Sequence, residues 1–287
     1  MPDEPIRDLT ARRAARPDAV REAARRRRRP DHWTGQRLMI IAADHPARGV
    51  IGVRGRPLAM ASRVDLLERL RVALRRPGVH GVLATADIIE DLLLLGELDG
   101  KVVVGSMNRG GLADAVFELD DRFTGYDAES LAAMGYEGGK MLCRIDPEDP
   151  GTLSTLESCG RAVTALARHG LLAMVEPLPV RRVDGRVRLD ADPDALIRAI
   201  GIASALGGTS AYTWLKLPVV DEMERVLEAT TLPVLLLGGD AATDEAYEGW
   251  RKALTNPAVR GLVVGRALLY PADDDVAAAV DAAAALL

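Results

Sequence analysis

Ala211-Tyr-Thr-Trp-Leu-Lys216-Leu-Pro218 is an apolar run that carries a lysine near its end and stops at a proline. Such a run is typical of a short buried strand. Of the 37 lysines and arginines in the chain, only four are lysines: Lys101, Lys140, Lys216 and Lys252. A lysine kept among apolar residues in such a chain is a candidate for function, because lysine can lose its proton and attack a carbonyl carbon whereas arginine cannot. The alternative is a lysine whose stem covers apolar surface while its ammonium group reaches water.

The same kind of run recurs along the chain. Eight runs lie at 38–43, 79–84, 101–105, 138–145, 171–175, 211–216, 233–237 and 261–264. Amphipathic segments separate them, and we expect helices over 61–75, 86–96, 127–135, 152–169, 193–206, 220–229, 242–254 and 273–287. Continuous apolar strands that alternate with helices are typical of a parallel sheet covered on both faces. Eight such units predict a single (β/α)8 TIM barrel over residues 37–287.

A doubly wound open sheet is the alternative fold. Its usual G-x-G-x-x-G motif after the first strand is absent, and His45-Pro-Ala-Arg-Gly49 stands there instead. The fifth strand is expected to end at Glu176-Pro177, and Asp184-Gly185 predicts the turn of a hairpin over 179–190. The polar, glycine-rich loop that begins at 106 and runs to about 126 is long enough to be functional.

Residues 1–36 form a basic extension with an arginine run from Arg25 to Arg29, followed by Pro30. Basic runs can bind nucleic acid. Here acidic residues are interspersed, and no aromatic residue lies within the run to stack on bases. We therefore expect two helices, over 6–14 and 17–28, packed outside the barrel.

The overall composition excludes several classes of partner. The chain has 287 residues and a net charge of −5, which gives no general reason to expect nucleic acid or membrane binding. No apolar run reaches the roughly 18 residues of a membrane span, and the first residues lack the apolar region of a secretory signal. Cys143 and Cys159 form no CxxC pair and lie in apolar patterns. Buried free thiols in a cytoplasmic protein are expected.

Polar and glycine residues follow the strands at the end where a barrel of this kind forms its site. They are Asp44 and His45 (first strand), Lys140 and Arg144 (fourth), Glu176 (fifth), Lys216 (sixth), Gly238 and Gly239 (seventh), and Gly265 and Arg266 (eighth). Two lysines and two carboxylates are therefore expected to meet over one barrel mouth.

This set of residues indicates imine chemistry. Desolvation or a second cation nearby makes a lysine amine available to attack a carbonyl carbon. Lys140 is a candidate for that second cation beside Lys216. Asp44 and Glu176 are candidates for the proton transfers that carbinolamine dehydration and C–C cleavage require.

The glycines after the last two strands indicate a phosphate site. Barrels often bind phosphate through backbone N–H groups after the seventh and eighth strands. Arg266 would add a charge-assisted contact, although glycine after a strand is also a common turn residue.

A metal-dependent mechanism is not expected. The chain has four histidines, His32, His45, His80 and His169, and only His45 falls at the carboxyl end of a strand. One histidine makes a weak metal site. We expect no metal and no cofactor.

Strand alternation raises one conflict. Lys216 shares its parity with Tyr212 and Trp214, which are bulky side chains for a barrel centre. Either the interior is wide at this strand, or Lys216 lies just beyond regular strand geometry.

Six short motifs, in order, resemble the class I aldolases that include tagatose 1,6-bisphosphate, sulfofructosephosphate and archaeal-type fructose-bisphosphate aldolases. The motifs are Ala43-Asp44-His45, Gly139–Pro147, Val175–Leu178, Leu215–Pro218, Leu236–Gly239 and Val264–Ala267. The resemblance covers about residues 37–270 and implies a metal-independent aldolase that acts on a phosphorylated ketose or keto sugar acid. One branch of similar proteins is associated with inositol breakdown, which would imply a phosphorylated 2-deoxy-5-keto sugar acid.

The resemblance implies a role for each group. Lys216 would form the Schiff base with Lys140 assisting, and Glu176 and Asp44 would act in proton transfer and hydroxyl binding. The glycine loops with Arg266 would bind phosphate, and His45 and Arg144 are further candidates for substrate binding. Lys216-Leu-Pro218 departs from the usual Lys-x-Glu-x-Pro, and Gly238 stands where a serine is common. Which of the two lysines forms the imine stays open.

Two other functions stay open. A barrel of this kind can bind a phosphosugar without turnover, as a sensor or scaffold. It can also act as a phosphosugar isomerase or epimerase that uses Asp44 and Glu176 without an imine. Barrels of the resembling family often associate, so a homo-oligomer is expected.

Overall fold

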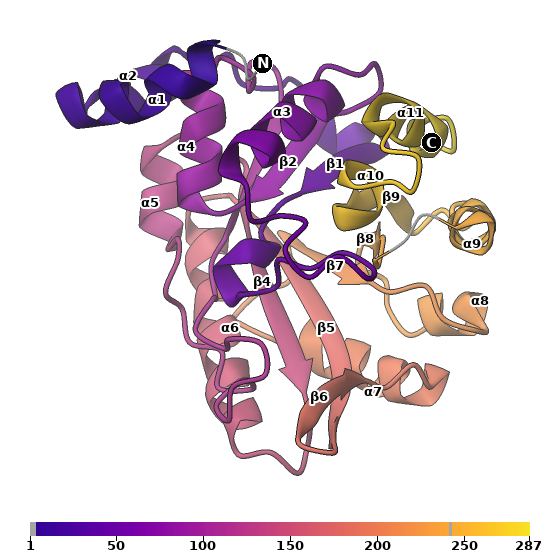
Figure 1. The fold of residues 1–287 in the computed structure, drawn as a ribbon. Helices are drawn as coiled ribbons and strands as arrows, with labels where there is room; N and C mark the ends of the chain where they lie inside the picture. The colour runs from indigo at the N-terminus through magenta and orange to yellow at the C-terminus, as the bar shows by residue number, and fades with distance from the viewer. Residues whose placement is uncertain (1–3, 241–242) are drawn as a thin grey trace.

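Eight parallel strands close into a barrel in the computed structural model, which describes residues 4–240 and 243–287 (Figure 1). The strands are β1 (Leu38–Ala42), β2 (Gly81–Ala84), β3 (Val102–Ser106), β4 (Gly138–Ile145), β5 (Leu172–Val183), β7 (Thr213–Leu217), β8 (Val234–Leu237) and β9 (Val259–Val264). Their order is β4-β3-β2-β1-β9-β8-β7-β5, and pairing of β5 with β4 closes the ring. The predicted barrel is confirmed, and the open doubly wound sheet is wrong because that sheet would leave β4 and β5 as edges.

Helices cover the outside of the barrel, as predicted. They are α3 (Arg63–Leu74), α4 (Ala86–Leu94), α5 (Ala128–Ala133), α6 (Gly151–Arg168), α7 (Pro193–Ser204), α8 (Met223–Leu227), α9 (Asp244–Ala253), α10 (Arg266–Leu269) and α11 (Val276–Ala284). Side chains of Ser62, Asp127 and Thr243 cap α3, α5 and α9 by accepting a backbone N–H of the first turn. The helix expected over 242–254 begins at Asp244, and residue 242 lies outside the described residues. The short α10 was not predicted, because four residues carry no helical periodicity.

The conflict over Trp214 is resolved by the barrel interior. Lys216 lies inside the regular strand β7, so the alternative that it lies beyond strand geometry is wrong. Trp214 packs inside the barrel with Leu38, Met174 and other alternate residues of the strands. Tyr212 precedes the strand and is 42% exposed.

Glycine positions and a second tryptophan belong to the barrel interior. Three interior positions of other strands are glycine, since Gly81, Gly138 and Gly261 pair in register with interior residues. A Cβ at these positions would lie 2.0–2.6 Å from atoms of Val102, Leu172 or Leu38 on a neighbouring strand, so only glycine fits there. Trp33 packs against the interior cluster, with its ring centroid 6.0 Å from that of Trp214. Trp214 therefore fills the barrel interior ahead of Lys216 along β7.

Strand β5 continues well past the predicted end at Glu176-Pro177. Its pairing with β4 runs on through Pro177, opposite Cys143, and Pro179, opposite Ile145. Its pairing with β7 stops at Val175. The backbone N–H of Ala173 donates to Tyr212, on the β7 side of β5. Alternate residues of a strand point their nitrogens to the same side, so the nitrogens of Pro177 and Pro179 also face away from β4. The pairing of β5 with β4 therefore does not need the N–H that proline lacks. The prolines therefore end one pairing without ending the strand.

The extension of β5 forms the predicted hairpin with β6 (Arg186–Leu189). Asp184 and Gly185 both have positive φ, 49° and 77°, as a two-residue hairpin turn of this hand requires. In Figure 1 the hairpin projects beyond the barrel next to the far end of β4.

The N-terminal segment forms α1 (Glu4–Ala15) and α2 (Ala19–Arg26), which contact α3 and α4 respectively. Among the described residues of the chain, no helix has the length and apolarity to cross a membrane. The free cysteines Cys143 and Cys159 are both buried, as expected.

One arginine of the basic run is buried. Arg27 contacts Glu137 at 2.9 Å, with both side chains 2% exposed, and it also donates to the carbonyl oxygens of Lys101 and Gly135. Glu137 in turn accepts the backbone N–H of Val103. The pair therefore joins the end of α2 to the base of β3 and β4.

We expect Arg27→Ala to lower the free energy of unfolding by about 3 kcal/mol, because the buried Glu137 carboxylate then keeps only Arg29, at 3.1 Å and 60% exposed, as its cation. Arg26→Ala is the matched control, since Arg26 belongs to the same run and its side chain is 70% exposed. Urea unfolding of both variants measures the difference. Equal effects of the two substitutions would contradict the structural role given to Arg27.

Candidate active site

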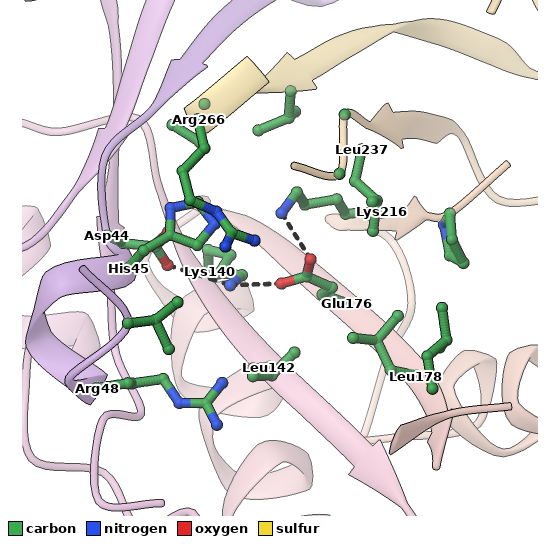
Figure 2. Close-up of a pocket in the computed structure, with 18 of the residues that line it drawn as sticks. Asp44, His45, Arg48, Lys140, Leu142, Glu176, Leu178, Lys216, Leu237 and Arg266 are labelled. Atoms are coloured by element: carbon green, nitrogen blue, oxygen red, sulfur yellow. Dashed lines mark hydrogen bonds and ion pairs between the residues drawn. The ribbon is translucent and has the colours of Figure 1, made fainter. Parts of the chain in front are cut away.

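A pocket of about 230 Å³ opens where the carboxyl ends of the strands meet (Figure 2). Nine of the ten residues predicted for the site line it: Asp44, His45, Lys140, Glu176, Lys216, Gly238, Gly239, Gly265 and Arg266. Arg144 does not. The strand ends thus bring together residues that are up to 222 positions apart in the chain.

The centre of the pocket is a chain of charged contacts. Lys216 Nζ lies 2.6 Å from Glu176 Oε1, and Lys140 Nζ lies 2.5 Å from Glu176 Oε2. Lys140 Nζ also lies 3.1 Å from Asp44 Oδ2. Figure 2 shows the two lysine nitrogens on either side of the Glu176 carboxylate. All four residues are at least nine-tenths buried.

Strand register explains this meeting point. Lys140 pairs with Met174 and Glu176 pairs with Leu142, so Lys140 and Glu176 stand on adjacent strands, one step of the interior face apart. Lys216 follows Trp214 by two residues on β7 and therefore faces the same interior. Asp44 follows the interior residue Ala42 by two positions, just after β1.

The cations hold both carboxylates ionised. Burial by itself would raise the pKa of Asp44, but the charges of Arg109 and Lys140 outweigh burial and hold that pKa well below its ordinary range. Burial likewise opposes ionisation of Glu176, yet Lys140 and Lys216 lower its pKa to about 2. The pKa of Lys140 is lowered, mainly by burial, against the opposing effect of the two carboxylates.

Sequence reasoning missed two residues that hold Asp44. Arg109 Nη2 lies 2.6 Å from Asp44 Oδ2, and Ser106 Oγ donates to the same oxygen at 3.1 Å. Arg109 belongs to the glycine-rich loop that was predicted to be functional, and Ser106, predicted as its first residue, is the last residue of β3. The polar loop itself was the available indication, but nothing in the pattern singled out Arg109 within it.

Arg144 supports that loop instead of lining the pocket. Its guanidinium contacts Glu118 at 2.6 Å and Asp121 at 3.4 Å, and it donates to the carbonyl oxygen of Gly111. Asn108 pairs with the backbone N–H and C=O of Leu142 through its side-chain amide. These contacts position the segment that carries Arg109.

The last two strands close another side of the pocket. A Cβ at Gly265 would lie 2.2 Å from the Ala42 carbonyl oxygen, and one at Gly238 would lie 2.2 Å from Val264 Cγ1, so no larger residue fits without displacement. Gly239 has a φ of 64°, which favours glycine. The guanidinium of Arg266 forms an ion pair with Asp240.

His45 faces the pocket as a neutral imidazole. Burial lowers its pKa to about 3, against the attraction of Asp44. Its Nδ1 is buried without a hydrogen-bond partner and lies 3.9 Å from Asp44 Oδ1. No group of three or more histidine, cysteine or carboxylate residues within 4–240 and 243–287 is placed to hold a metal ion.

The remaining lining is mostly apolar. Leu142 and Leu178 come from β4 and β5, and Leu189 comes from the hairpin strand β6. Pro218 and Leu237 complete this wall. The pocket therefore has one charged side and one apolar side, and the extension of β5 builds part of the apolar side.

Comparison with solved structures supports this description of the fold. The crystal structure of Cgl0159 from Corynebacterium glutamicum (Brevibacterium flavum) is 52% identical, with a TM-score of 0.96 over 99% of this chain and 96% of that one. A Schiff-base-forming fructose-1,6-bisphosphate aldolase has a TM-score of 0.64 at 19% identity, over 93% of this chain and 99% of that one. An archaeal fructose-1,6-bisphosphate aldolase, with its catalytic lysine bound to the carbinolamine intermediate, has a TM-score of 0.63 at 18% identity. That alignment covers 93% of this chain and 98% of the archaeal one.

The two aldolases share the fold of this chain, and at these identities the likeness concerns the fold alone. No curated protein matches the sequence significantly. The family model described as Cgl0159-like matches residues 36–284, which is nearly the whole barrel. The chain belongs to the Cgl0159-like family.

Proposed function

We propose that this protein is a metal-independent class I aldolase that cleaves or forms a C–C bond through a lysine Schiff base. The observation that carries the proposal is the Glu176 carboxylate held between Lys140 and Lys216, 2.5 Å and 2.6 Å away, at the barrel mouth. Two buried lysines that share one carboxylate are costly to bury and are rarely needed for stability alone. Solved aldolases with the same fold, described as Schiff-base-forming, add support.

In the proposed reaction the Lys216 amine bonds to the ketone carbon of the substrate, and the carbonyl oxygen takes a proton. The carbinolamine then loses water to give an iminium ion. The bond between the α-carbon and the carbon that bears the hydroxyl then breaks. Its electron pair forms the C=C bond of an enamine, the iminium nitrogen takes up the C=N electron pair, the hydroxyl gives its proton to a base, and the departing carbon leaves as an aldehyde. The remaining enamine takes a proton and is hydrolysed, which restores the amine.

The neighbouring residues have separate tasks in this scheme. Glu176 contacts the Lys216 nitrogen directly and is the group placed to carry protons at that atom. Lys140 lies 2.5 Å from the other oxygen of Glu176 and is placed to polarise the substrate oxygen. Asp44, held ionised by Arg109, accepts a hydrogen bond from a substrate hydroxyl.

The proposed substrate is a phosphorylated ketose or keto sugar acid. Gly238, Gly239, Gly265 and Arg266 lie together on one side of the pocket and would bind the phosphate through N–H groups and the guanidinium. The sugar acid proposed more specifically is a 2-deoxy-5-keto-gluconate 6-phosphate of inositol breakdown. The apolar wall that includes Leu142 and Leu178 suits a carbon without a hydroxyl.

The isomerase alternative is less well supported by the site. A base that abstracts a proton next to a carbonyl works best with a pKa near the working pH. The pKa of Glu176 is about 2 and that of Asp44 is held well below its ordinary range, so neither is a good base for a substrate C–H proton. In the aldolase scheme Glu176 exchanges its proton with the Lys216 nitrogen itself, and the charge of that nitrogen is one cause of the lowered pKa.

Borohydride added with a phosphorylated ketone should produce a covalent adduct, read by intact mass, because reduction traps the iminium on lysine. Lys216→Arg should abolish the adduct, and Lys252→Arg, an exposed site on α9, should leave it unchanged. Peptide mapping then identifies the lysine. Tight phosphosugar binding with no adduct for any ketone tested would favour the non-catalytic barrel, and an adduct confined to Lys140 would reassign the nucleophile.

Glu176→Gln should lower kcat for aldol cleavage by about 10²–10⁴-fold, because the amide cannot carry the proton at the Lys216 nitrogen. Glu148→Gln is the matched control, since Glu148 is exposed in the loop after β4. Single-turnover measurements separate imine formation from product release. An unchanged kcat in Glu176→Gln would remove Glu176 from the proton path.

A further inference from the structure

The charged groups at the bottom of the pocket do not balance. Arg109, Lys140 and Lys216 are the cations of this cluster, and Asp44 and Glu176 are its carboxylates. All five are at least nine-tenths buried, with exposed fractions between 2% and 8%. With every group in its ordinary ionised form, the cluster holds three positive charges against two negative ones.

An unpaired charge in such a place is costly, and a buried ionisable group tends to lose its charge instead. Arginine does not deprotonate in proteins, whereas lysine does. The cluster becomes neutral if one of the two lysines gives up its proton. Without the Arg109 charge, two lysine ammonium groups and two carboxylates would already balance, and both lysines would stay protonated.

We propose that Arg109 is a positioning residue whose fixed charge keeps one of the two buried lysines as a neutral amine. Arg109 Nη2 lies 2.6 Å from Asp44 Oδ2, and Lys140 Nζ lies 3.1 Å from the same oxygen. The negative charge of Asp44 is therefore compensated mainly by Arg109, and less of it stabilises a charged Lys140. Glu176 is then left to pair with only one charged lysine. The usefulness of the amine rests on the proposed aldolase function, but its protonation state can be tested without any substrate.

The other groups around the cluster do not restore the balance. Ser106, on β3, is neutral, and His45, after β1, has a pKa of about 3 and carries no charge at neutral pH. Arg266, after β9, is paired with Asp240. Arg48, which lines the same pocket (Figure 2), and Arg144 add two positive charges, and Glu118 and Asp121 offset them at 3.7 Å and 3.4 Å.

The direction of titration at Lys140 agrees with this assignment. Burial lowers the pKa of Lys140, Asp44 and Glu176 oppose that change, and the charges of Lys216 and Arg109 lower the pKa further. The guanidinium of Arg109 donates to Asp44 alone among the described residues, and Asn108, next to it in the chain, fastens the backbone to Leu142 of β4. The cation therefore comes from outside the strands and is kept in place by contacts that do not involve the lysines.

The scarcity of lysine makes a direct test practical. The double variant Lys101→Arg/Lys252→Arg removes the two lysines outside the cluster, so protein labelled with ¹³C at lysine Cε gives two signals, from Lys140 and Lys216. These signals are titrated by NMR in the absence of substrate, with Arg109 intact and with Arg109→Gln. Arg122→Gln is the matched control, because Arg122 belongs to the same loop and its side chain is 73% exposed.

With Arg109 intact, one of the two signals should have the shift of a neutral amine at about pH 8, well below the roughly 10.4 midpoint of free lysine. Arg109→Gln should raise that midpoint by about one pH unit or more, since it removes a like charge. The control should leave it in place.

Two results would overturn the inference. In the first, both lysines remain ammonium groups up to about pH 9 with Arg109 intact, and this result is obtained without any substitution in the pocket. Alternatively, the midpoint could stay within about 0.3 units in Arg109→Gln, which would assign Arg109 to structure or to direct substrate binding. If borohydride traps an adduct but the lysine midpoint is the same in Arg109→Gln, this inference is wrong and the aldolase proposal stands. If the midpoint rises in Arg109→Gln but no ketone gives an adduct, this inference stands and the aldolase proposal is wrong.

Discussion

The structure depends most on the contact of one carboxylate with two lysine nitrogens. Glu176 places one oxygen against Lys140 and the other against Lys216, at the level where the barrel interior meets the pocket. Removing either lysine would take away one hydrogen-bond donor of that carboxylate, and removing the carboxylate would leave two buried lysine nitrogens without their shared partner. The barrel strands hold the three side chains at this distance, so the reactive geometry is set before any substrate arrives.

The layers beneath and above this contact serve it in different ways. Below, Trp214 and its neighbours fill the interior, with Trp33 packed against them. Above, β5 runs on past Pro177 and builds an apolar wall with the β6 hairpin. The charged cluster is therefore enclosed by apolar material on two sides, which strengthens every electrostatic interaction within it.

Fold likeness and site chemistry carry different weight. The barrel resembles solved class I aldolases at 18–19% identity, which concerns architecture and not reaction. The 52% identical Cgl0159 structure places the chain in its family and leaves the reaction to the residues. Imine chemistry is favoured by the buried pair of lysines in a chain whose other cations are mostly arginine. Arg109, in the loop after β3, adds a fixed positive charge to the same cluster.

The sequence by itself determined the barrel and nine of the residues around its pocket, because strand parity and the end of each apolar run are local properties that repeat eight times. Tertiary structure alone decided three matters: that Arg109 reaches Asp44, that Arg144 turns away to support the loop, and that β5 continues through its prolines. Each depends on a partner distant in the chain. A long loop has no periodicity from which its path can be predicted, and a proline ends a strand only on the side where a neighbour needs its missing N–H.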